Sequence, residues 1–436
     1  MIKFLYPIDL IEVTKDYWNS FRSKYEQHVS GLHFPDDENL LSMMNVMYHL
    51  SFEKEESRNI SATIAYMEPS DNLSGILNRS SPPIRFENII RFSKSELIRL
   101  SPAFNPKTSI LTVCAEEKII EGGSPNQLVI WGVIFLGNDY TNLKNGRASG
   151  ALSPPFIFTL EVSEPGELLA SASGEQFFKL KGGQLTNSPL KDISEGIIGN
   201  HFSNITNKLY LEVCEGLQRD RYSEDDSNDT PKTLYFSTLR NILRLIEKKR
   251  HGGTLIVVPE SLPNEVFRDS LHMKYQLKSP KIWDEFLNKC INERLYFDVL
   301  FKKGKDIQEY EQILDSKRRI GRAEKKIFEH EEFISSLSEV DGAVVLNEKF
   351  EILGFGAEIR LTNDELTSIK KANDPYGNDT TNLNIISYGT RHRSAIRYCN
   401  YNKDAIAFVI SQDGKVKSIK QHEGVTYLWD GINLEP

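Results

Sequence analysis

The chain has 436 residues, of which 26% are charged and 39% hydrophobic, and its formal net charge is −8. This length predicts two or three domains, and the composition is that of an ordinary soluble globular protein. The negative charge disfavours a general nucleic-acid binder, because such proteins usually carry a basic excess.

Cysteine spacing and apolar runs predict the compartment. The four cysteines are far apart and lack zinc-type spacing; they are Cys114, Cys214, Cys290 and Cys399. This predicts free buried thiols in a reducing compartment. The apolar run over residues 128–136 is far shorter than the ~20 residues that span a bilayer. The first residues do not form a signal peptide. We therefore expect a cytoplasmic protein without a membrane span.

The first half of the chain mixes helix and strand patterns. Apolar spacing of three and four predicts a helix over 37–50, and Ser93 begins a short helix that includes Leu100. Segments rich in β-branched and aromatic residues predict strands over 60–67, 109–115, 127–136, 155–162 and 175–180. Residues 198–217 predict a closing helix. Together these elements predict an α+β domain over residues 1–218.

A composition break and a change of pattern define the second half. Residues 219–231 are polar and acidic, as is typical of an exposed linker. An amphipathic helix then ends at Gly252-Gly253, and residues 254–258 are apolar after Thr254, which predicts a strand buried on both faces. This order of elements is typical of an α/β domain, here over residues 232–436.

Further elements follow within this predicted α/β domain. Helices are predicted over 283–295, 363–371 and 394–399, and strands over 340–346, 350–359, 405–410 and 416–419. Residues 302–332 are heavily charged and predict solvated helices. A nucleic-acid role for Lys317-Arg318-Arg319 is possible, but the acidic neighbours favour a solvated helix face.

A basic cluster at Gly389-Thr390-Arg391-His392-Arg393 is a candidate phosphate site. Thr390 suits a helix N-cap, so the three potential cations would occupy the first helical turn, where the helix dipole disfavours them. An anion would offset this cost, because helix N-termini bind anions and arginine forks match phosphate oxygens. The alternative is a surface basic turn paired with nearby carboxylates.

Asp341-Gly342-Ala343 is the second candidate motif. Its carboxylate suits a metal ion or a hydroxyl proton, and the two small residues would let a flat ring or a phosphate approach the backbone. The alternative is an aspartate that caps a turn at a strand edge. Common phosphate loops and hydrolase signatures are absent from the sequence. Together, the two motifs offer what nucleotidyl transfer needs, namely phosphate neutralisation and a carboxylate-bound divalent metal.

Four segments, read in order, resemble the diadenylate cyclase (DAC) domain. They are Gly253–Val258, Asp341–Val345, Gly389–Ala395 and Val409–Gln412, and the resemblance covers about residues 233–430. The N-terminal half resembles, more diffusely, the sensor domain that precedes some bacterial DAC domains. The resemblance implies a central mixed twisted sheet flanked by helices, and regulation by an unidentified ligand or protein at the N-terminal domain.

The resemblance also implies an activity. The family condenses two ATP molecules into cyclic di-AMP and two pyrophosphates with Mg or Mn, across facing domains of a homodimer or higher homo-oligomer. Asp341 would bind the metal and help to activate the 3′-hydroxyl, and Asp413 is a second candidate metal ligand. Catalytic roles at the phosphates are implied for Thr390, Arg391, His392 and Arg393, with His392 as a hydrogen-bond donor. ATP-binding roles are implied for Gly342, Ala343, Gly389, Ser394 and Ser411.

Two positions depart from the common family pattern. Val340 stands where many members have histidine, and Ser411-Gln412-Asp413 stands where many have Ser-Glu-Glu. The first hypothesis is an active cyclase controlled by its N-terminal domain. The alternative is a catalytically silent sensor that binds a nucleotide or cyclic dinucleotide. A nucleic-acid binder is disfavoured, because aromatic and basic residues are not interleaved.

Overall fold

The computed structural model divides the chain into two compact units, residues 1–187 and 188–435. Each unit has its own sheet and its own hydrophobic core. The structure describes residues 4–434 apart from 56–57, 72–82, 107, 137–155, 174, 186–191, 223–229, 261–269, 279–280, 301–306, 362–367, 413–415 and 433.

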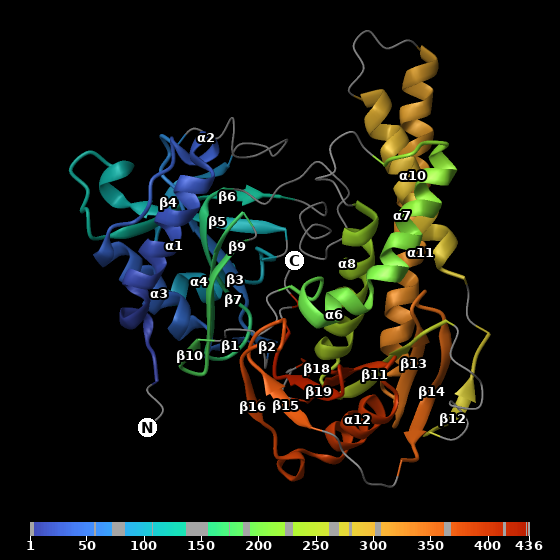
Figure 1. Cartoon of the computed structure of the whole chain (residues 1–436). Coiled ribbons are helices and arrows are strands. Elements are labelled where there is room, and N and C mark those ends of the chain that lie inside the picture. Colours follow the sequence, from blue (N-terminus) through green and yellow to red (C-terminus); the bar gives the residue numbers. More distant parts are fainter. Residues whose placement is uncertain are drawn as a thin grey trace. The chain divides into compact units, whose positions relative to one another are not determined.

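The first unit is built on an eight-stranded sheet (Figure 1). In spatial order the strands are β10 (Gln184–Leu185), β9 (Glu175–Lys181), β8 (Glu167–Ala172), β7 (Phe158–Val162), β3 (Ala62–Tyr66), β5 (Ser109–Ala115), β6 (Leu128–Phe135) and β4 (Ile84–Arg91). β3 and β5 pair in parallel, and the other described pairs are antiparallel.

Helices cover this sheet and complete the core of the first unit. They are η1 (Pro7–Leu10), α1 (Ile11–Lys24), α2 (Glu26–Val29), α3 (Asp37–Leu50), α4 (Lys94–Leu100) and η2 (Glu116–Lys118). A separate pair of short strands, β1 (Lys54–Glu55) and β2 (Arg58–Asn59), runs antiparallel. Trp18 and Phe21 of α1 pack with Phe158 and Phe177 of the sheet. The predicted helices at 37–50 and 93–100 are confirmed, and Ser93 caps the second through the amide of Glu96. The mixture of helices and strands confirms an α+β unit.

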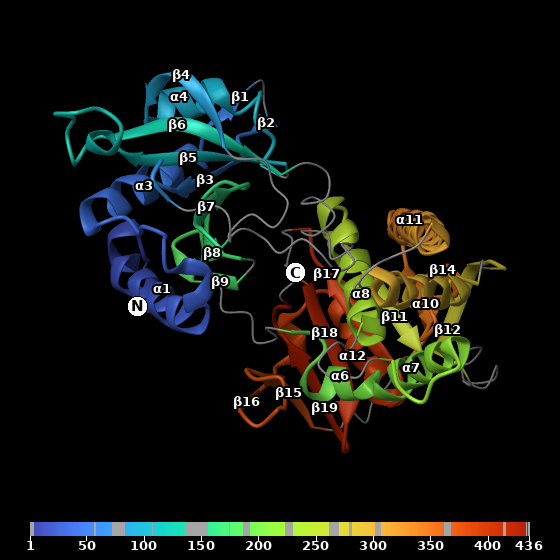
Figure 2. The same cartoon turned by 90° about the horizontal axis from the view of Figure 1, so that it is seen from above.

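The second unit is built on a nine-stranded mixed sheet (Figure 2). In spatial order the strands are β12 (Leu271–Gln276), β14 (Ile352–Ile359), β13 (Ala343–Asn347), β11 (Gly253–Val258), β17 (Ile406–Ile410), β18 (Val416–His422), β19 (Val425–Trp429), β15 (Ile369–Ala372) and β16 (Thr380–Asn382). β11 runs parallel to β13 and β15 runs parallel to β19, which confirms the predicted mixed sheet.

Helices pack on both faces of this sheet. Alternate residues of β11 show this directly: Leu255 and Val257 join one apolar cluster, and Ile256 and Val258 join another. The first cluster includes α6 (Gly196–His201), α7 (Ser203–Leu217), α8 (Thr230–Lys248), α10 (Trp283–Leu300) and α11 (Ile307–Leu337), and the second includes α12 (Thr390–Tyr401), which follows η3 (Ile385–Ser387). The predicted strand buried on both faces is confirmed.

The boundary between the units lies ahead of the predicted one. The predicted closing helix of the first domain is two helices, α6 and α7, and both belong to the second unit. Ile205, Leu209 and Val213 of α7 are buried in the same cluster as α8 and α10, which explains this placement. Residues 223–229 of the predicted linker lie outside the described residues, and Tyr222 just before them is buried.

Two other predictions of secondary structure need correction. Residues 369–371 of the predicted helix over 363–371 belong instead to strand β15 (Ile369–Ala372), which pairs with β19; residues 362–367 lie outside the described part. The charged segment after α10 forms one long helix, α11, rather than several. One side of α11 is buried through residues that include Ile320 and Ile327, so the segment is only partly solvated.

The four cysteines are free and buried, as predicted. Burial raises the pKa of the thiols of Cys114, Cys290 and Cys399 to about 12. Within the described ranges, no helix combines the length and the apolar character that crossing a membrane requires.

Candidate functional site

The two predicted motifs meet at one edge of the sheet in the second unit. β13 begins at Ala343, directly after Asp341-Gly342, and its parallel neighbour β11 begins at Gly253. β17 runs antiparallel to β11 and pairs its last residue, Ile410, with Gly253. Ser411 follows Ile410, so this edge of the sheet gathers the start of two strands and the end of a third.

The N-terminus of α12 carries the basic cluster. Gly389 is the N-cap residue and Thr390 is the first helical residue, so the predicted N-cap role of Thr390 is wrong by one position. No side chain caps the helix, and its first turn contains no acidic residue. The backbone N–H groups of the first turn therefore have no carboxylate from that turn to pair with, and Arg391 and Arg393 lie beside them. This arrangement is suited to binding an anion.

Asp341 and Arg391 are brought together, although they are 50 positions apart. The distance from Asp341 Oδ1 to Arg391 Nη2 is 3.8 Å, and the Asp341 side chain is 91% exposed. An ion pair this long and this exposed contributes about 0–1 kcal/mol at most. Both groups can therefore turn to a ligand at little cost. This juxtaposition was predicted from the two motifs.

Gly252 supports Arg391, a role that was not predicted. The backbone φ of Gly252 is +70°, and a Cβ at this position would lie 2.7 Å from Arg391 Nη1. The same Cβ would lie 3.4 Å from Cγ of Gln412. Arg391 thus rests over a glycine, with Gln412 beside it. In the sequence, Gly252 reads only as the stop signal after α8.

Gly342 lies against the backbone of β14 at Gly356. Its φ is +117°, and a Cβ would lie 2.5 Å from the carbonyl carbon of Gly356. The small residues next to Asp341 therefore serve the packing of two strands. Ala343 is 3% exposed and belongs to the core cluster beneath α12, so its contact with a ligand stays a prediction.

His392 is held by an aromatic and ionic network that the sequence did not predict. Its ring lies 5.6 Å from the ring of Tyr388, centroid to centroid, and Lys417 Nζ lies 5.0 Å from the Tyr388 centroid. Lys417 also donates to Asp430, and Lys371 Nζ donates to the same carboxylate at 3.0 Å. Burial raises the pKa of the Tyr388 hydroxyl, and the nearby Asp430 carboxylate adds to this shift.

The Asp430 carboxylate gives a pH-dependence that can be measured. Burial alone would raise its pKa, but hydrogen bonds from Lys417 and Lys371 outweigh burial and the net shift is downward from 3.8. A lowered pKa in the folded state contributes stability above pH 3.8 that is lost as pH falls through the folded value. We expect the difference in free energy of unfolding between wild type and Asp430→Asn to shrink between pH 5 and pH 3, as measured by urea denaturation.

The matched control is Asp315→Asn, which removes a carboxylate from an exposed pair with Arg319 on α11. This change should alter the free energy of unfolding by less than about 1 kcal/mol. A difference between wild type and Asp430→Asn that stays constant over the pH range would contradict the assignment.

The remaining predicted residues are less well defined. Ser394 and Ser411 are half-buried at the same edge, and Asp413 lies outside the described residues. Among the described side chains, no group of three or more His, Cys, Asp or Glu residues could hold a metal ion by itself. The exposed Asp341 carboxylate still fits Mg²⁺ or Mn²⁺, because Mg²⁺ at nucleotide sites is often held by one or two carboxylates together with phosphates and waters.

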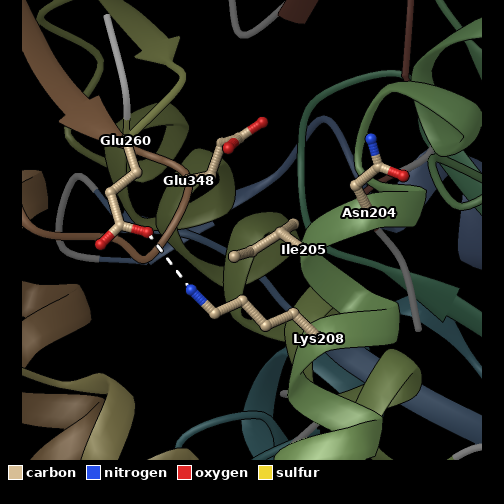
Figure 3. A pocket seen from close by; sticks show the side chains of 5 residues that line it. All are labelled: Asn204, Ile205, Lys208, Glu260 and Glu348. Carbon is tan, nitrogen blue, oxygen red and sulfur yellow. Dashed lines mark ion pairs between the residues drawn. The ribbon is translucent and has the colours of Figure 1, made fainter.

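A separate pocket lies at the other end of the same strands (Figure 3). Glu260 follows β11 and Glu348 follows β13, and with Asn204, Ile205 and Lys208 of α7 they line a volume of about 300 Å³. Lys208 points toward Glu260, with an Nζ to Oε2 distance of 3.6 Å. Burial raises the pKa of Glu348, and the Glu260 carboxylate adds to the shift. None of these residues was predicted.

Comparison with known proteins adds one finding in the first unit. Residues 31–135 match the family model described as probable sensor domain DACNV, which confirms the predicted resemblance to such a domain over these residues. No curated protein matches the chain. A crystal structure of a double mutant of DacA from Staphylococcus aureus is similar at 12% sequence identity, over 45% of this chain and 85% of that chain. Its TM-score of 0.21 is too low to support a shared fold.

Proposed function

We propose that the second unit is a diadenylate cyclase that condenses two ATP molecules into cyclic di-AMP, and that the first unit regulates it. The observation that carries this proposal is the meeting of Asp341 with Arg391 at the N-terminus of α12, 3.8 Å apart. The sensor match over residues 31–135 supports it, because this kind of domain precedes DAC domains. The resemblance of four ordered segments to the DAC domain supplies the reaction.

In this proposal, Arg391 and Arg393 hold the triphosphate. The guanidinium groups and the free N–H groups of the first turn neutralise phosphate charge. Gly252 leaves room for the Arg391 side chain, because a Cβ at this position would lie 2.7 Å from Arg391 Nη1. His392, oriented by Tyr388, donates a hydrogen bond to a phosphate oxygen.

Asp341 would hold Mg²⁺ or Mn²⁺ and accept the proton of the ribose 3′-hydroxyl. A bound divalent ion would supply Lewis-acid stabilisation of the α-phosphate. The exposed Asp341 side chain can reach a nucleotide, since its one described ion-pair contact is weak. One site holds only one ATP, so a second copy must present its own ATP for in-line attack.

The direct test is to incubate the purified full-length chain with ATP and either Mn²⁺ or Mg²⁺. We expect cyclic di-AMP and pyrophosphate in a ratio of about 1:2, measured by mass spectrometry and by a phosphate assay coupled to inorganic pyrophosphatase, with a rate per chain that rises with protein concentration. Absence of product with either metal, for a chain shown by circular dichroism to be folded, would overturn the proposal.

The second candidate function is a silent nucleotide or cyclic-dinucleotide sensor. The observation that favours it is Gln412 beside Arg391, where the resemblance leads one to expect a carboxylate. Isothermal titration with ATP and with cyclic di-AMP separates the two functions. Binding without turnover would favour the sensor, and turnover would exclude it.

A further inference from the structure

One face of α11 exposes an apolar stripe at helical spacing. Ile307, Tyr310 and Leu314 are 80%, 57% and 55% exposed, and they lie three and four residues apart. On a helix this spacing places them on one side. The buried residues of α11, which include Ser316, Ile320 and Ala323, lie on another side that faces the core. The stripe therefore does not contribute to the core of its own unit.

Two charged side chains beside the stripe lack ion-pair partners among the described residues. Other charged side chains of this helix pair within the helical layer, such as Arg319 with Asp315 and Lys326 with Glu285 of α10. Glu311 and Arg318 flank Leu314 on the stripe side, and neither has an ion-pair partner among the described residues. A stripe of exposed apolar side chains with unpaired charges of both signs is typical of an interaction surface.

Gly321 completes the pattern. It lies within the 31-residue helix α11, where glycine costs about 1 kcal/mol relative to alanine. Nothing lies within 4 Å of the position where its Cβ would be, so its own chain gives no steric reason for a glycine. Gly321 is two helical turns after Leu314, and Ile307 is two turns before it.

We propose that α11 pairs with α11 of a second copy of this chain, antiparallel, about a two-fold axis at Leu314. A two-fold axis brings each residue level with the one that is equally far from Leu314 on the other helix. Ile307 then meets the partner's Gly321, which leaves room for it. Tyr310 then lies level with the partner's Arg318 and offers it an aromatic face. Glu311 lies one residue further along the helix, a rise of about 1.5 Å, and offers the same guanidinium a carboxylate.

The self-complementary charges favour a second copy over a different protein. The same Glu311–Arg318 pair forms twice in one symmetric contact, and Leu314 packs against its own copy. The proposed contact involves a single stripe on each helix, so we expect an association that is weak and depends on concentration. The inference does not depend on the reaction proposed above, and its test measures association alone.

The first experiment is disulfide trapping in the full-length chain. All four native cysteines are buried, so Leu314→Cys adds one exposed thiol. We expect an intermolecular disulfide to form at least tenfold faster at this position than in the control Gln312→Cys, which is also exposed but lies on the other side of α11. Equal rates would overturn the proposal and leave the stripe to a different protein.

The second experiment exchanges the two charges. Glu311→Arg and Arg318→Glu should each weaken self-association by about threefold to tenfold in sedimentation equilibrium. The double variant restores both pairs, because the contact is symmetric, and should associate within about twofold of wild type. A double variant as weak as the single variants would exclude the antiparallel pairing.

Discussion

Asp341→Asn should reduce cyclic di-AMP formation by about 100- to 1,000-fold at saturating ATP and metal. Asparagine has the same shape but cannot accept the 3′-hydroxyl proton or carry the negative charge that a divalent cation needs. The side chain is 91% exposed and its described ion pair is 3.8 Å long, so the fold does not depend on it. Initial rates by mass spectrometry, together with the thermal midpoint, measure both effects.

Asp315→Asn is the matched control, because it makes the same change on an exposed aspartate of α11. It should keep the wild-type rate. ATP binding by Asp341→Asn should also persist, because Arg391 and Arg393 remain. A variant that keeps more than one-tenth of the wild-type rate would remove Asp341 from the reaction, even if the chain proves to be a cyclase.

The central strands could be predicted because their environment is uniform. Thr254–Val258 is apolar at almost every position, and only a strand covered on both faces accommodates such a run. α3 was predictable for a related reason, because apolar spacing and the Asp36 N-cap agree. In both cases, local preference and tertiary packing indicate the same structure.

The predictions of secondary structure and of the domain boundary failed where tertiary contacts determine the structure. Residues 369–372 contain two lysines and resemble the end of a helix, but pairing with β19 makes them a strand. The amphipathic pattern of α7 predicts a helix and does not say which core buries it, so the boundary was placed about thirty residues late. Apolar periodicity shows that one face of a helix will be buried, but it does not show which core that face packs against.

The residues of the candidate site also fall into those that the sequence could predict and those that it could not. Asp341 and Arg391 carry chemistry that is visible in the sequence, and their meeting could be anticipated from the motifs. Gly252 could not, because its proximity to Arg391 follows from the register of β11 and β17. Tyr388 and Lys417 carry no recognisable signal in the sequence. Only the fold places the Tyr388 ring against His392 and the Lys417 ammonium over the Tyr388 ring.

The glycines of the two motifs should respond differently to the same change. Gly342→Ala puts a Cβ 2.5 Å from the backbone of Gly356, at a φ of +117° that alanine rarely adopts. Backbone strain and overpacking together should lower the free energy of unfolding by about 2–4 kcal/mol. Cyclase activity should fall as well, because the start of β13 carries Asp341. Urea denaturation gives the first quantity and initial rates give the second.

Gly389→Ala is the matched glycine-to-alanine control. Nothing lies within 4 Å of a Cβ at Gly389, and its φ of −65° suits any residue, so the cost is limited to the weaker N-cap preference of alanine, about 1 kcal/mol or less. A loss at Gly389 that equals the loss at Gly342 would contradict the geometry of both. The expected difference implies that the glycine beside Asp341 is required by strand packing, whereas the glycine before Thr390 leaves open space at the N-terminus of α12, where a phosphate would enter.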